Sequence, residues 1–167
     1  MSRHLTDART AERKSEMPIS QKCQYGLRAI YELARHGGPG PLKIAEIARR
    51  QAIPLRFLEV ILNELKRGGF IRALRGKDGG CILARPAGEL TVGEVMRFIE
   101  GSFAPVGCVS EDNTDCCPLK GRCVFLPLWG RAHDALASVY DGTSFQDLID
   151  QESLMAQTNE SCLNYMI

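Results

Sequence analysis

The sequence has 167 residues, of which 44% are hydrophobic, so it is long and apolar enough for one domain with its own core. No run approaches the roughly 18 apolar residues that a membrane span needs, and the charged N-terminus lacks the apolar stretch of a secretory signal. These features argue against a membrane protein or a secreted one and predict a cytoplasmic location, with residues 1–17 as a flexible leader.

Charge is distributed unevenly along the chain. The front part, residues 1–90, contains 17 Lys and Arg and 9 Asp and Glu. The back part, residues 91–167, contains 4 Lys and Arg and 11 Asp and Glu, and the two parts sum to the net charge of +1. The front is therefore at +8 and the back at −7. This division predicts a module that binds a polyanion, joined to a segment with a different task.

The first helix is expected to begin at Pro18 and to end where residues 37–41 (GGPGP) interrupt it. Apolar residues along it recur at steps of four, three, one and three, which places them on one face. Lys22 and Arg28 lie off this face. The apolar positions are Cys23, Leu27, Ile30, Tyr31 and Ala34.

Two shorter helices are predicted next, over residues 42–50 and 55–67, joined by a tight turn at 51–53. Pro54 suits a helix start, where its missing N–H is not needed, and two glycines end the second helix. Such a pair is typical of a helix-turn-helix motif. The second helix directs Arg56, Glu59, Asn63 and, at its end, Arg67 outward. The inward positions are Ile44, Ile47, Ala48, Leu55, Leu58, Ile61, Leu62 and Leu65.

A short hairpin is predicted directly after these helices. Residues 70–74 (FIRAL) and 81–84 (CILA) have the composition of strands, and residues 75–80 (RGKDGG) form the turn. The predicted fold class is therefore mainly α with a small β-wing, a winged helix-turn-helix. The wing tip carries Arg75 and Lys77 among glycines, which let a backbone approach DNA closely, and a narrow minor groove attracts an inserted arginine.

Further helices are predicted in the back part. Residues 91–94 (TVGE) match a capping box, so a helix should cover 92–99 and end at Gly101. A long helix over 128–140 has a broad apolar side, which predicts a homodimer joined through it; packing on the first helix is the alternative. A short helix should follow from Ser144. The expected division is a leader (1–17), a winged helix-turn-helix DNA-binding domain (18–101), a cysteine loop (102–124), a dimerisation helix with a C-terminal helix (125–150) and a flexible tail (151–167).

Four of the seven cysteines lie between residues 108 and 123, in a stretch without helical or strand periodicity. In a reducing compartment, clustered cysteines bind metal or carry out redox chemistry more often than they form structural disulfides. Iron–sulfur clusters are held by thiolates. Four cysteines also suit tetrahedral zinc, but the tandem Cys-x-x-Cys pattern of many zinc ribbons is missing. An iron–sulfur cluster is therefore favoured, with zinc and metal-free thiols as the alternatives.

In several motifs the chain resembles the IscR/NsrR-type bacterial transcription regulators of the Rrf-two superfamily. The resemblance covers residues 18–150. The matching motifs are residues 25–30 (YGLRAI), 43–48 (KIAEIA), 55–59 (LRFLE), 75–80 (RGKDGG) and 83–86 (LARP), followed by the cysteine loop and Trp129. It implies a homodimeric winged-helix protein that binds double-stranded DNA at a near-palindromic operator and carries an iron–sulfur cluster on three cysteines. Some members lack the cluster and respond to metabolites or thiol chemistry.

The resemblance also implies roles for individual residues. The three cluster cysteines are Cys108, Cys117 and Cys123, with Cys116 as the alternative to Cys117. Some members have a histidine as fourth ligand where this chain has Leu126, and others use the first helix, where Cys23 or Gln24 is the candidate. A 2Fe-2S cluster is favoured, with 4Fe-4S as the alternative. The candidate DNA-binding residues are Arg28, Arg56, Glu59, Asn63, Arg75 and Lys77.

The predicted function is a sequence-specific transcription regulator controlled by an iron–sulfur cluster that senses iron–sulfur status, redox state or nitric oxide. One alternative is a cluster-free regulator of the same fold that responds to thiol chemistry or a metabolite. The other is an iron–sulfur or thiol redox protein that does not bind DNA. The sequence shows no nucleophile–base pair, phosphate loop or paired catalytic carboxylates, so no enzymatic activity is expected.

Overall fold

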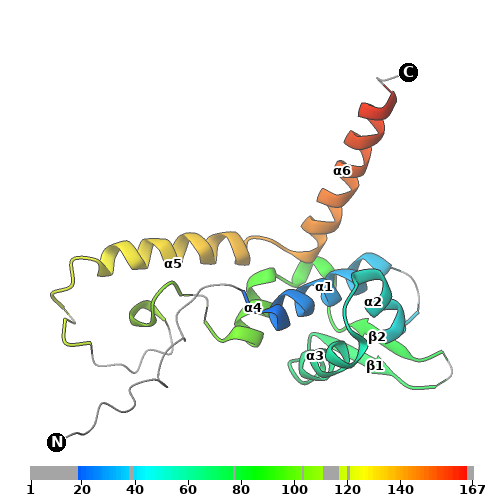
Figure 1. Cartoon of the computed structure of the whole chain (residues 1–167), viewed down its shortest axis with the longest axis horizontal. Helices are drawn as coiled ribbons and strands as arrows, with labels where there is room; N and C mark the ends of the chain where they lie inside the picture. Colours follow the sequence, from blue (N-terminus) through cyan, green and yellow to red (C-terminus); the bar gives the residue numbers. More distant parts are fainter. Residues whose placement is uncertain are drawn as a thin grey trace, which may run out of the picture.

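A computed structural model describes residues 19–37, 40–76, 78–102, 104–110, 117–119 and 121–164, with side chains as far as Gln157 (Figure 1). The predicted leader, 1–17, lies outside this part, as do Lys77 and Cys116. Three helices form the head of the molecule. They are α1 (Gln21–His36), α2 (Ile44–Gln51) and α3 (Leu55–Arg67).

The wing follows α3. Strands β1 (Ile71–Leu74) and β2 (Gly80–Leu83) pair antiparallel, with Ile71 opposite Leu83 and Leu74 opposite Gly80. Leu42, which the sequence assigned to the second helix, instead bridges to Cys81 through two backbone hydrogen bonds of 2.9 Å each. The wing is thereby fixed to the chain just before α2. The mainly helical structure with its small hairpin confirms the predicted winged helix-turn-helix.

Local signals explain where the head helices begin and end. The Ser20 hydroxyl accepts a hydrogen bond of 3.1 Å from the Cys23 backbone N–H and caps α1, so the helix begins three residues later than predicted. Between α2 and α3, Ala52 takes a left-handed conformation with φ of 49°. The Ile53 N–H then donates to the Ala48 carbonyl at 2.9 Å and closes the tight turn.

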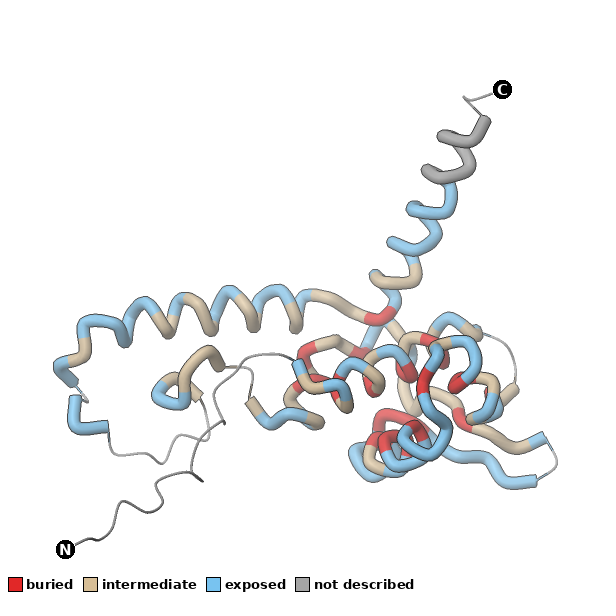
Figure 2. The backbone as a smooth tube through the Cα atoms, viewed as in Figure 1, coloured by how far each residue is buried: buried red, intermediate tan, exposed pale blue. Residues whose placement is uncertain are grey.

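The core lies where α1, α2, α3 and the wing meet, as the buried segments in Figure 2 show. The predicted inward residues of α3 are buried with one exception. Leu55 is 44% exposed, because it occupies the first helical position, at the margin of the buried stripe. The prediction that it packs inward is wrong. The fully buried large side chains of the head include Ile30, Ile47, Leu58, Ile61 and Leu65.

The 3-10 turn η1 (Ala87–Glu89) leads to α4 (Val92–Glu100), which begins with the predicted capping box between Thr91 and Glu94. Two backbone hydrogen bonds tie this region to a point far along the chain. The Val92 N–H donates to the Thr143 carbonyl at 2.9 Å, and the Phe145 N–H donates to the Leu90 carbonyl at 3.0 Å. The chain between the last two helices is thus held at the start of α4.

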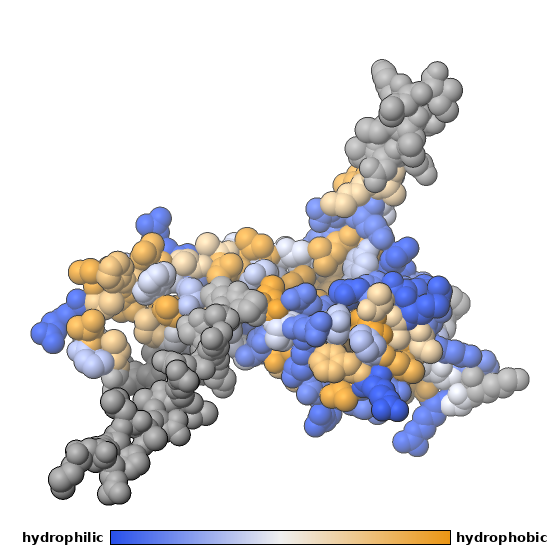
Figure 3. Space-filling view, viewed as in Figure 1, coloured by the Kyte–Doolittle hydropathy of each residue, from blue (hydrophilic) through white to orange (hydrophobic). Residues whose placement is uncertain are grey.

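A second 3-10 turn, η2 (Gly107–Val109), precedes the long helix α5 (Leu126–Asp141). In Figure 1, α5 runs outward from the head. Its C-terminal half packs beside α1 and α4. Apolar side chains gather along α5 in Figure 3. None of its residues is buried in the protomer.

The last helix, α6 (Phe145–Asn164), rises from the head in a different direction from α5 (Figure 1). Phe145 is fully buried in the core, and Arg35 of α1 pairs with Glu152 at 3.2 Å. The predicted helix end near Asp150 is wrong. Residues 151–164 are polar, but they contain neither Gly nor Pro, so nothing in them stops the helix. Within the described residues, no helix has the length and apolar character needed to cross a membrane.

Candidate nucleic-acid interface and cysteine segment

The outward face of α3 displays the side chains that the sequence proposed as base contacts. Arg56, Glu59 and Asn63 are all exposed, opposite the buried Leu58, Ile61, Leu62 and Leu65. Guanidinium, carboxylate and amide groups are the usual partners of base edges in the major groove. The structure thus places these three predicted residues together on one accessible helix face.

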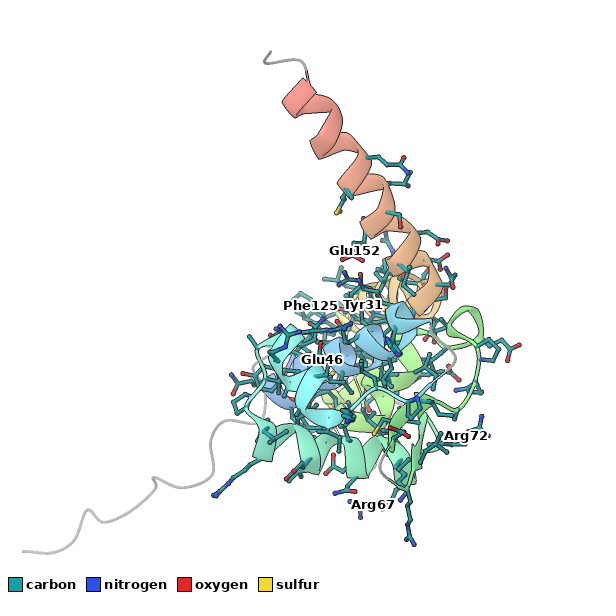
Figure 4. The ribbon with its side chains drawn as sticks, turned by 90° about the vertical axis from the view of Figure 1, so that its right-hand side faces the viewer. Tyr31, Glu46, Arg67, Arg72, Phe125 and Glu152 are labelled. Atoms are coloured by element: carbon teal, nitrogen blue, oxygen red, sulfur yellow. The ribbon has the colours of Figure 1, made fainter. Side chains whose placement is uncertain are left out.

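The wing adds cations next to this face. Arg75 is exposed where the wing tip begins, beside Gly76, whose φ of +114° suits only glycine. Arg72 on β1 is also exposed, and Figure 4 shows Arg67 and Arg72 extending from the same side of the head. The sequence interpretation missed Arg72 as a candidate. Strand alternation could have found it, because its neighbour Ile71 is buried and successive strand residues face opposite ways.

These cations differ from five other arginines of the described chain. In the described part of the chain, Arg56, Arg67, Arg72 and Arg75 form no ion pair, whereas carboxylates lie beside Arg35, Arg49, Arg50, Arg85 and Arg97. Cations without a carboxylate partner leave a positive potential that attracts a polyanion. These four arginines all belong to α3 and the wing.

Arg28, the remaining predicted DNA contact on α1, has partners within the protein. Its guanidinium donates to the Gln51 side chain at 3.3 Å and to the Gln51 backbone carbonyl, at the end of α2. It also lies over the Tyr25 ring, 5.6 Å from the ring centroid. These contacts join α1 to α2 in the helix-turn-helix. The structure thus gives Arg28 a positioning role that the sequence did not suggest.

A second link between α1 and α2 is centred on a fully buried carboxylate, Glu32. It accepts hydrogen bonds from Arg50 at 3.0 Å and from the Gln51 amide at 2.6 Å. Arg50 in turn meets Glu46 at 2.6 Å, and hydrogen bonds from Arg49 and Arg50 lower the pKa of Glu46 to about 2. Glu46 thus keeps its charge except in strong acid. The apolar pattern of α1 gave no signal for Glu32.

The cysteine segment, residues 108–123, is described at its two ends. Cys108 in η2 and Cys117 are exposed, Cys123 is partly exposed, and all three are free thiols. No three His, Cys, Asp or Glu side chains among the described residues gather closely enough to hold a metal ion. Thiolates are the right kind of ligand for an iron–sulfur cluster. The three cysteines therefore fit such a cluster in kind, but in the protomer they do not converge on one.

The candidates for a fourth ligand lie in different surroundings. Cys23 is fully buried beside Met96, and burial, reinforced by Glu100, raises its pKa to about 12. The thiolate is the ligand form, so this setting does not favour Cys23. Gln24 is exposed, and its amide donates to the Ile19 carbonyl at 2.8 Å. Cys81 is buried in the wing, where desolvation raises its pKa, in keeping with a purely structural role.

Comparison with known proteins adds a family to this geometry. Residues 19–151 match the Rrf2 family model, described as an iron-dependent transcriptional regulator. The chain is 33% identical over 138 residues to protein rrf2 of Nitratidesulfovibrio vulgaris, covering 83% of this chain and 91% of that protein. The solved structure of CymR, the global cysteine regulator of B. subtilis, aligns with a TM-score of 0.66 at 32% identity, covering 81% of this chain and 98% of CymR. The structure of IscR from T. potens aligns with a TM-score of 0.63 at 27% identity, covering 81% of this chain and 88% of that IscR chain.

Proposed function

Because the chain belongs to the Rrf2 family of transcriptional regulators, we propose that it binds a specific DNA operator and that its cysteine segment controls this binding. The observation that carries the DNA-binding part is the position of Arg56, Arg67, Arg72 and Arg75. They belong to α3 and the wing and have no carboxylate partners among the described residues. In a helix-turn-helix protein, the second helix enters the major groove and its N-terminal residues contact base edges.

The operator follows from the shape of a dimer. A homodimer carries two heads related by a two-fold axis, so it reads two half-sites whose centres lie about 34–36 Å apart, or a multiple of that distance, in a near-palindromic sequence. Selection of binding sites from a random duplex library tests this. We expect one near-palindromic sequence to be enriched, with affinity that falls steeply as salt rises. If the protein binds all duplexes of the library equally well, or binds none of them, it is not a sequence-specific regulator.

An iron–sulfur cluster is the proposed occupant of the cysteine segment. The support is the donor set: three accessible thiols in one short stretch, in a chain whose family model is described as iron-dependent. When bound, the cluster would supply a redox-active, ligand-sensitive group. Cys108, Cys117 and Cys123 would hold it. Their described arrangement does not converge, so binding requires a rearrangement of the segment.

Anaerobic purification followed by absorption spectroscopy and iron and sulfide analysis tests this assignment. Cys108→Ser, Cys117→Ser and Cys123→Ser should each lose colour, iron and sulfide, because a site with three cysteines has no thiolate in reserve. Cys116→Ser and Cys81→Ser serve as controls that remove a neighbouring and a buried thiol. Both should retain the cluster. Iron and sulfide at wild-type levels in all the variants would refute these three ligands, and a wild-type protein without iron and sulfide would refute the cluster.

A metal-free thiol switch is the second candidate. It is favoured by the exposure of Cys108 and Cys117 and by the similarity to CymR, the global cysteine regulator of B. subtilis. In this case, two thiols of the segment would give two electrons and two protons to an oxidant such as a peroxide and form one disulfide. DNA affinity would then change on oxidation and recover with a reductant, with no iron in the protein.

A further inference from the structure

The outward face of α3 contains an apolar side chain at its centre. Arg56, Val60, Asn63 and Arg67 follow one another at steps of four, three and four residues and therefore form a single stripe. This stripe is diametrically opposite the buried residues of the helix. Val60 lies in the middle of it and is 55% exposed. It is thus the apolar member of a face that otherwise carries cations and polar groups.

Val60 differs from the other exposed apolar residues of α3. Leu55 lies at the first helical position, on the margin of the buried stripe, and the Phe57 and Tyr25 rings form a T-shaped pair with centroids 5.8 Å apart. Both side chains lie away from the centre line of the outward face. A single exposed valine is ordinary on a protein surface. What requires an explanation is the location of Val60 between Arg56 and Asn63, on the outward face of α3.

The shape of the stripe suits the floor of a groove. Arg56 and Arg67 are separated by about 16.5 Å along the helix at 1.5 Å per residue. When the helix lies in the major groove, these long side chains at its two ends can reach past the base edges to the backbone. Between them Val60 is short, and its branched Cβ restricts it to one main rotamer in a helix, so its methyl groups occupy fixed positions.

Only one apolar group projects into the major groove of DNA, the C5-methyl group of thymine. We propose that Val60 contacts this methyl group of a thymine in each half-site and so makes the operator require a thymine there. The proposal rests on the DNA-binding function above and adds a base to it. The thymine lies between the base that meets Arg56 and the base that meets Asn63, because Val60 lies between these residues on the stripe.

The test removes the methyl group from the DNA and from the protein separately. Each thymine of the sequence enriched by library selection is replaced in turn by deoxyuridine, which lacks only the C5-methyl group. Affinity is measured for the wild-type protein, for Val60→Ala and for the control Leu154→Ala, which trims an exposed side chain on α6. Thermal denaturation checks that the variants remain folded, as expected for a substitution of an exposed residue.

With the wild-type protein and Leu154→Ala, we expect deoxyuridine at one thymine per half-site to weaken binding about fourfold, and about fifteenfold in both half-sites. This is the effect of losing one buried methyl group, ~0.8 kcal/mol. Val60→Ala should bind the unmodified operator more weakly and lose this dependence. If deoxyuridine weakens wild-type protein and Val60→Ala equally, or weakens neither, the methyl contact is refuted while DNA binding stands. If no sequence is enriched, the DNA-binding function fails and the contact with it.

Discussion

Among single residues, the arginines of α3 and the wing are distinguished by having no carboxylate partner among the described residues. Arg50 and Arg97 are held by carboxylates at 3.0 Å and 2.6 Å, and those bonds would have to break before either could reach a phosphate. Arg75 forms no ion pair within the described residues and is exposed beside Gly76. Its guanidinium can therefore enter a groove without first losing a partner. Binding of Arg75 to DNA therefore does not include the cost of breaking an ion pair within the protein.

Replacing Arg75 by alanine should weaken binding to the operator by roughly 1–3 kcal/mol, the range for one good base contact. Competition titrations with operator and random duplexes measure the change. Lys77→Ala, two residues further along the sequence, should weaken binding to all duplexes more evenly and flatten the dependence on salt, as loss of a phosphate contact does. Arg35→Ala is the control, because Arg35 pairs with Glu152 at the base of α6. Unchanged operator affinity in Arg75→Ala would remove the wing from the interface.

Among the elements, the wing is attached to the head by a close approach between the backbones of Leu42 and strand β2. Leu42 and Cys81 exchange two hydrogen bonds of 2.9 Å, which bring the chain before α2 against β2. A Cβ atom added at Gly80 would lie 2.4 Å from the Leu42 carbonyl oxygen and 2.7 Å from its carbon. Both are backbone atoms and cannot rotate away. Glycine at this position is therefore what allows the wing to join the head.

Gly80→Ala should lower the free energy of unfolding by about 1–3 kcal/mol, the usual cost of inserting a methyl group into a packed site. Thermal or denaturant unfolding measures it. Gly40→Ala is the matched control, because a Cβ atom there would have no neighbour within 4 Å. It should leave stability nearly unchanged. Equal midpoints for Gly80→Ala and the wild-type protein would show that the bridge to Leu42 adds nothing to stability.

At the scale of the whole molecule, α5 has an apolar face that no other described part of the chain buries. Leu128, Ala135 and Val139 are separated by seven and four residues and so lie on one side of the helix, where all three are exposed. The other side, with Leu136, Ala137 and Tyr140, packs beside Cys23 and Met96. Packing on the first helix, the alternative reading of the sequence, therefore holds for one side of α5, and the dimer through its other side stays a prediction. Its packed side belongs to the protomer, and its outer side is available to a second copy.

Leu128→Glu should shift the protein from dimer to monomer, because it places a charge within the proposed interface. Sedimentation at micromolar concentration measures the mass. Ser138→Glu adds the same charge to an exposed position of α5 away from the apolar face, and it should remain dimeric. Loss of the dimer should also reduce operator affinity, because two linked heads bind more tightly than one. A wild-type protein that sediments as a monomer contradicts the dimer directly.

The sequence by itself determined the winged helix-turn-helix and most of its element boundaries. Helical spacing, the Thr91–Glu94 capping box and the glycines flanking the wing are local features, and local geometry is enough to define them. The outward position of Arg56, Glu59 and Asn63 on α3 followed from the same periodicity. Of the proposed interface, Arg67 and Arg72 were not among the predicted DNA contacts.

Only the tertiary structure decided which side chains meet across distance. It buried Glu32 against Arg50 and Gln51, gave Arg28 a partner on α2, and left Leu55 exposed. It also extended α6 to Asn164 and kept the described cysteines from converging. The contacts of Glu32 and Arg28 join residues far apart in the sequence. Such contacts are set by how the helices pack together, and the periodicity of a single segment carries no record of them.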